Sequence, residues 1–157
     1  MGFYLWLEGL GLFTWVRESP TVWGYPTVLT LHTFSMAVLV GASAVLSLRI
    51  LGVGATIPLA PLRSLFLMFW AGWWVSLVTG LLLFGAAATQ RGVQGMFFAK
   101  LLLVAAGTAI VVLIKRHGYG PSADHVAVNR AAQRLALTLL LVWVVTITAG
   151  RLLAYVV

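Results

Sequence analysis

Acidic residues are almost absent from this sequence, and cysteine is absent altogether. Of the 157 residues only three are Asp or Glu, and charged residues make up 8% of the chain. An average soluble domain carries about a quarter charged residues, so a soluble protein of this size could not cover its surface with polar groups. Because 62% of the residues are hydrophobic, with a mean hydropathy of +1.05, we expect an integral membrane protein.

These absences also remove whole classes of chemistry. Without cysteine there can be no disulfide, thiolate metal site, iron–sulfur cluster or covalently attached c-type haem. The acidic residues Glu8, Glu18 and Asp124 all lie outside the long apolar segments, which argues against a carboxylate proton relay within the membrane. No nucleophile–base arrangement or phosphate-binding loop is evident. We therefore favour a non-catalytic subunit of a membrane complex over an enzyme.

Four apolar stretches approach the roughly 20 residues that a helix needs to cross about 30 Å of hydrocarbon. They predict spans at about residues 26–48, 64–87, 97–114 and 135–157. Residues 1–21, rich in aromatics and lacking a basic start, predict a retained amphipathic segment at the membrane interface rather than a signal peptide. The predicted fold is an all-α integral membrane bundle, with residues 22–157 as its four-helix transmembrane domain.

The distribution of Lys and Arg predicts the orientation. The formal net charge of +7 does not indicate nucleic-acid binding, because most of the cations lie at the ends of apolar segments. The first and third connections should be cytoplasmic because they hold more cations, which places both termini outside, in a bacterial inner membrane. The cations of these two connections are Arg49, Arg63, Lys115, Arg116, Arg130 and Arg134.

Three ionisable residues fall within the predicted spans: His32, Lys100 and Arg151. Such residues are costly in hydrocarbon unless they are paired, reach the interface or face a cavity. The predicted topology places all three in the outer half of the bilayer. Snorkelling to the headgroups would explain Lys100 and Arg151, and a hydrogen bond to a neighbouring helix would explain His32. A ligand-binding role for His32 is the competing interpretation.

Helical spacing adds polar neighbours to these three residues. Met36 follows His32 by one turn, and Thr148 and Tyr155 share a face with Arg151. The predicted cofactor-binding set is therefore His32, Met36, Lys100, Thr148, Arg151 and Tyr155.

Three ligand chemistries fit a lone intramembrane histidine. His32 could ligate the iron of a b-type haem whose propionates Lys100 and Arg151 neutralise, although a second axial ligand would have to be found. It could instead hydrogen-bond a quinone carbonyl, which needs no second histidine. His32 with Met36 could also bind copper(I), since imidazole and thioether suit that ion.

Several segments resemble a family of uncharacterised bacterial four-helix integral membrane proteins. They are LHTFSMAVLVGASAVLSLRILG, WAGWWVSLVTGLLLFG, FFAKLLLVAAGTAIVVLIKRH and TITAGRLLAYVV, together with the amino-terminal WLEGLGLFTWVRES. The resemblance implies the four-helix fold and marks His32, Lys100, His117, Gly150 and Arg151, but it implies no activity. There is a fainter similarity to copper-resistance D type proteins and to small b-type cytochromes.

From the sequence we predict a small membrane subunit of a redox or electron-transfer complex, with a quinone or b-haem site around His32. Its partners would be the lipid bilayer and other membrane or periplasmic subunits. The main alternative is a structural or accessory subunit without a cofactor of its own. Copper or small-solute transport is the third.

Overall fold

The computed structural model describes residues 2–58, 60–118 and 130–152, which form helices, turns and loops without a strand. Four long helices dominate: α3 (Tyr25–Ile50), α4 (Ser64–Gly85), α6 (Gly95–Gly118) and α7 (Arg130–Leu152). Each is long and apolar enough to cross a membrane. The prediction of an all-α protein with four candidate membrane spans is confirmed.

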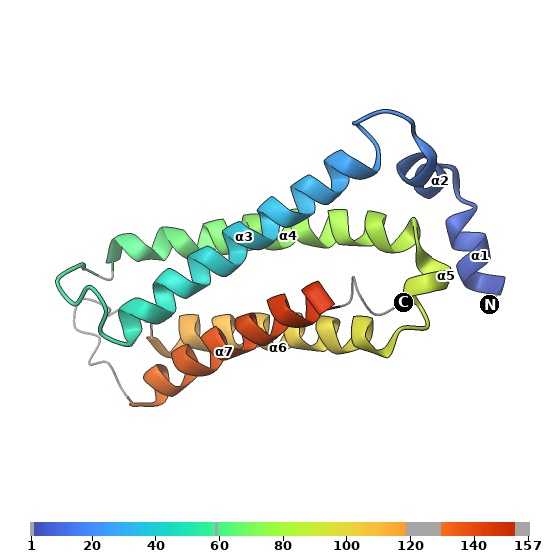
Figure 1. Ribbon diagram of the computed structural model, residues 1–157. Helices are drawn as coiled ribbons and strands as arrows, with labels where there is room; N and C mark the ends of the chain where they lie inside the picture. The colour runs from blue at the N-terminus through green and yellow to red at the C-terminus, as the bar shows by residue number, and fades with distance from the viewer. Residues whose placement is uncertain (1, 59, 119–129, 153–157) are drawn as a thin grey trace.

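The four helices form two antiparallel pairs (Figure 1). Helix α3 packs along α4, α6 packs along α7, and α3 also contacts α7, so that α3 and α7 join the two pairs. The shared core contains the fully buried side chains of Leu39, Phe69, Leu139 and Trp143. Outward-facing positions are apolar too, as at Leu67, which is 75% exposed, and this surface suits lipid rather than water.

Glycines allow close contact between helices at two crossings. A Cβ at Gly72 of α4 would lie 2.9 Å from the Ser35 carbonyl oxygen of α3, so this crossing has no room for a side chain. Gly107 of α6 similarly accommodates the Trp143 ring of α7, 3.1 Å from the position of its missing Cβ. Small residues allow such close approach, which raises van der Waals contact between helices in a membrane.

Short helices close one end of the bundle. The predicted single amino-terminal segment contains two helices, α1 (Gly2–Glu8) and α2 (Gly11–Glu18), because the backbone at Leu10 is extended. They gather with α5 (Ala88–Arg91) at the right of Figure 1. The Phe13 ring seats against Gly85, and Val16, 1% exposed, packs with Val28.

The two ends of the bundle differ in what they carry. We call the end with α1, α2, α5 and the start of α3 the His32 end. The opposite end, which we call the basic end, contains the loop after α3 and the short helix η1 (Ala60–Arg63). In that loop the carbonyl oxygens of Ala55 and Ile57 accept hydrogen bonds from Arg49, near the end of α3. The basic residues at this end are Arg49, Arg63, Lys115, Arg116, Arg130 and Arg134.

Candidate ligand site at the His32 end

The His32 side chain projects from the second turn of α3 toward α4. Its ring nitrogen Nδ1 lies 3.0 Å from the Thr79 hydroxyl oxygen. That hydroxyl donates its single proton to the Val75 carbonyl oxygen, 2.6 Å away. With the hydroxyl in this orientation Nδ1 is the donor to Thr79, and the ring then presents a lone pair at Nε2; with the hydroxyl turned toward Nδ1 the roles reverse.

The ring fits against α4 because position 80 is glycine. A Cβ there would lie 3.2 Å from His32 Cε1, closer than most side-chain contacts. The Ser76 backbone carbonyl of the same helix also lies beside the ring as a hydrogen-bond acceptor. One face of α4, formed by Ser76, Thr79 and Gly80, therefore positions the imidazole.

Two cations lie near the ring, Lys100 from α6 and Arg91 from α5, and both act on it through their charge. The end of the Lys100 side chain crosses to α7, where its Cε lies 3.3 Å from the position that a Cβ of Gly150 would occupy. Arg91 Nε is buried without a hydrogen-bond partner in the described structure. A buried donor without a partner is costly, so Arg91 is suited to receive an anionic or carbonyl oxygen.

The carboxylates of the described residues do not neutralise this pair. Glu8 accepts hydrogen bonds from the Thr89 backbone N–H and hydroxyl, both at 2.7 Å, and its other oxygen lies 3.7 Å from Arg17. Glu18 also contacts Arg17, at 2.9 Å. The two Thr89 hydrogen bonds, with the charge of Arg17, hold the pKa of Glu8 below its usual value. Both glutamates thus make their contacts within the amino-terminal helices or between these helices and α5.

The other predicted site residues are more scattered. Met36 is partly buried and packs against the hydrophobic core. The Thr148 hydroxyl donates to the Val144 carbonyl of its own helix, and the Thr148 and Arg151 side chains are both exposed. Tyr155 lies outside the described residues. The geometry therefore brings His32 and Lys100 together and leaves Thr148 on the outer surface of α7.

Sequence reasoning missed Thr79 and Arg91 as members of the site. Neither residue is among the predicted cofactor-binding residues. Arg91 is the last residue of α5, and its Nε is buried. A partial signal existed, since Arg91 is the sole cation between the second and third spans.

A metal centre would have few protein ligands here. Among the described residues, no group of three or more His, Cys, Asp or Glu side chains comes together. His32 would supply a single imidazole, and the thioether of Met36, one helical turn further along α3, would be the next ligand atom in the sequence. The donor set is better suited to hydrogen-bonding and ion-pairing an organic ligand than to enclosing a metal ion.

Comparison with known proteins adds no relative: no family model, curated protein or solved structure matches this chain. The resemblance to uncharacterised four-helix membrane proteins stays a prediction.

Proposed function

We propose that this protein is a small membrane subunit of a redox or electron-transfer complex and that its His32 end binds a quinone. The observation that supports this most is the imidazole whose Nδ1 lies 3.0 Å from the Thr79 hydroxyl, on the same side of the bundle end as two cations. A quinone headgroup carries two carbonyl oxygens on an apolar ring. It could accept a hydrogen bond or a nearby positive charge at each of them.

The hydrogen bond between His32 and Thr79 suits both redox forms of such a ligand. With the proton on Nδ1, Nε2 accepts a hydrogen bond from a quinol hydroxyl. If the Thr79 hydroxyl turns from the Val75 carbonyl to donate to Nδ1, the tautomer reverses and Nε2–H donates to a quinone carbonyl. One hydroxyl rotation therefore adapts the site to either form.

Arg91 and Lys100 would act on the more electron-rich oxygen of the ligand. Their positive charge favours a polarised carbonyl, and the partial burial of Lys100 strengthens that effect relative to water. The same two cations could pair with haem propionates while His32 Nε2 ligated the iron. A b-type haem would require a further axial ligand, so we place the quinone first.

Binding of a short-tailed benzoquinone to purified protein tests the proposal. His32→Ala should weaken binding about tenfold or more, because it removes the fixed hydrogen bond, and Thr79→Val should weaken it several-fold. Thr148→Val, which removes an exposed hydroxyl bonded to its own helix, is the matched control and should bind like wild type. Affinity is measured by tryptophan-fluorescence titration.

Equal affinity in all four proteins, or no binding to wild type, would contradict a quinone site at His32. An absorption spectrum of the same preparation separates the haem alternative, since a Soret band that disappears in His32→Ala would assign His32 to haem.

A structural or accessory role is the second candidate, and the same hydrogen bond favours it. A bond between α3 and α4 within a membrane stabilises a helix pair by about 1 to 2 kcal/mol at most. In this role His32→Ala lowers the unfolding free energy by about that amount and changes no ligand. Copper or small-solute transport gains no support from the arrangement of His32 and Met36.

The location follows from charge. We propose that the basic end faces the cytoplasm of a bacterial inner membrane and that both termini lie outside. The quinone site would then open in the outer half of the bilayer, where membrane or periplasmic redox partners could reach it.

A further inference from the structure

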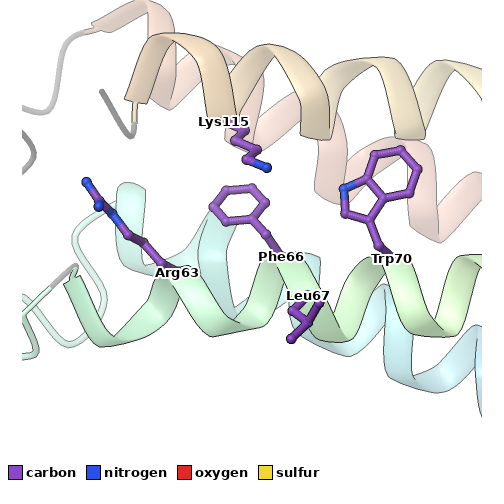
Figure 2. Close-up of a pocket in the computed structure, with 5 residues that line it drawn as sticks. All are labelled: Arg63, Phe66, Leu67, Trp70 and Lys115. Carbon is purple, nitrogen blue, oxygen red and sulfur yellow. The ribbon is translucent and has the colours of Figure 1, made fainter. Parts of the chain in front are cut away.

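A cavity of about 370 Å³ lies between α4 and α6 at the basic end. Figure 2 shows Lys115 reaching from α6 toward the Phe66 ring, with Arg63 on one side and Trp70 on the other. The Lys115 Nζ atom lies 5.9 Å from the centre of that ring, within cation–π range. Leu67 completes the lining, so the cavity combines two cations with an apolar and aromatic wall.

The cavity lies where lipid headgroups meet hydrocarbon. Arg63 directly precedes α4, and Lys115 is in the last turn of α6, so both cations belong to helix ends. Trp70 lies seven residues further along α4, about 10 Å deeper at 1.5 Å per residue. Leu67, between them on α4, is 75% exposed and faces outward. The lining thus runs from charged to apolar along the direction of a lipid molecule.

The α4–α6 side of the bundle leaves space for such a molecule. These two helices meet through individual side chains, as where Trp73 Nε1 donates to the Thr108 hydroxyl oxygen at 3.2 Å. Nearer the His32 end, the Phe84 and Phe97 rings stack with centres 5.2 Å apart. At the basic end, the cavity separates α4 from α6, and the Lys115 side chain reaches across it.

Among the described residues, this end carries charge of one sign. Six basic residues lie there, whereas the described carboxylates, Glu8 and Glu18, lie at the opposite end of the bundle. Basic pockets between transmembrane helices at the headgroup level bind anionic lipids. A small soluble anion would leave the Leu67 and Trp70 wall without a matching apolar group.

We propose that this cavity is a specific site for an anionic phospholipid. The lipid phosphate lies between Arg63 and Lys115, and the first carbons of an acyl chain cover Leu67 and Trp70. The Phe66 ring holds the Lys115 ammonium at the cavity mouth, so that the cation is oriented toward the phosphate before the lipid arrives. This site is separate from the proposed quinone site and does not depend on it.

Native mass spectrometry of the detergent-purified chain tests the proposal, with phosphatidylglycerol and phosphatidylcholine of identical chains as probes. Wild type should retain one phosphatidylglycerol in preference to phosphatidylcholine. The double variant Arg63→Gln/Lys115→Gln should lose that preference by about tenfold or more. Arg116→Gln/Arg130→Gln removes two exposed cations from the same end but not from the cavity, and should stay within about twofold of wild type.

A second measurement places the lipid even if a variant folds poorly. Phosphatidylglycerol brominated near the start of its chains should quench wild-type tryptophan fluorescence more than it quenches Trp70→Phe. Equal retention of both lipids by wild type, or equal losses in both double variants, would overturn the proposal. Inorganic phosphate that displaces the lipid completely at millimolar concentration would show an anion site without lipid specificity, which also overturns it.

Discussion

Cations occur at both ends of the bundle, but in opposite settings. At the basic end, Arg63 and Lys115 lie at helix ends with exposed side chains, next to a cavity open toward lipid. At the His32 end, Lys100 and Arg91 lie partly buried beside an imidazole, and Arg91 Nε has no hydrogen-bond partner in the described structure. The first arrangement fits a lipid headgroup, and the second fits a ligand that enters the bundle.

This contrast indicates that the burial of a cation is more informative than its number. Five of the six cations at the basic end are exposed, and an exposed cation at the membrane interface carries little energetic cost. Two partly buried ones near His32 require compensation, because burial without a counter-charge is expensive. The His32 end, which has fewer cations, is therefore the better candidate for a functional site.

Single-cysteine labelling tests the contrast most directly, since its outcome is all or none. The chain has no native cysteine, so Ile57→Cys in the loop of the basic end and Val22→Cys near the His32 end each report one side. Both positions are exposed, at 50% and 68%. We expect an impermeant maleimide added outside intact cells to label position 22 and spare position 57.

The reverse result would place the basic end outside and contradict the orientation proposed from charge. Labelling of both positions from one side would contradict the single membrane crossing that α3 makes between them. Detergent-permeabilised cells provide the control, because both thiols should then react.

The fold was largely predictable because a membrane-spanning helix can be recognised from the length and apolar composition of its segment. The predicted span at 64–87 agrees closely with α4 (Ser64–Gly85), and the span at 26–48 lies within α3 (Tyr25–Ile50). Apolar length alone decides such elements. The end of α3 was less visible, since it depends on Gly52, whose φ of +100° suits glycine.

The candidate site was only partly predictable, for a physical reason. His32 and Lys100 stood out because ionisable residues are rare within apolar spans. Thr79 did not, because a threonine in a membrane helix usually bonds its own backbone, as Thr148 does. Arg91 did not stand out because it lies between two spans. Whether such a cation is buried depends on how α5 packs, and no local sequence pattern predicts that packing.

Acidification should destabilise the packing of the amino-terminal helices at the His32 end and leave the stability of the basic end unchanged. The pKa of Glu8 is lowered by Thr89 and Arg17, so its contribution to stability is complete above the ordinary value of 4.5 and is lost as pH falls through the lower folded-state pKa. Glu8→Gln should cost about 1 kcal/mol at neutral pH. It should also flatten the pH dependence below 4.5, as measured by thermal unfolding under circular dichroism.

Glu18→Gln is the matched control, because Glu18 contacts Arg17 at the surface and makes no bond to α5. Its unfolding should keep the wild-type pH dependence. If both variants behave alike, the amino-terminal helices are not held to α5 through Glu8, and the His32 end is closed by apolar contacts such as Phe13 against Gly85.

The smallest effect is expected midway between the two ends. Trp73 Nε1 donates to the Thr108 hydroxyl and so links α4 to α6. Thr108→Val should lower the unfolding free energy by only about 0.6 kcal/mol, a typical value for a hydrogen bond between membrane helices. Thr148→Val, which alters no contact between helices, is the control, and both are compared by unfolding in mixed detergent.

The same variant decides whether the two ends act independently. The Trp73–Thr108 bond touches neither the imidazole nor the lipid cavity, so Thr108→Val should leave quinone and phosphatidylglycerol binding within about twofold of wild type, as for distant, uncoupled sites. A larger change at both ends together would mean that the α4–α6 contact transmits between them. In that case α4, which carries Thr79 near one end and Phe66 near the other, would move as a unit, and each ligand should alter the affinity for the other by the same factor.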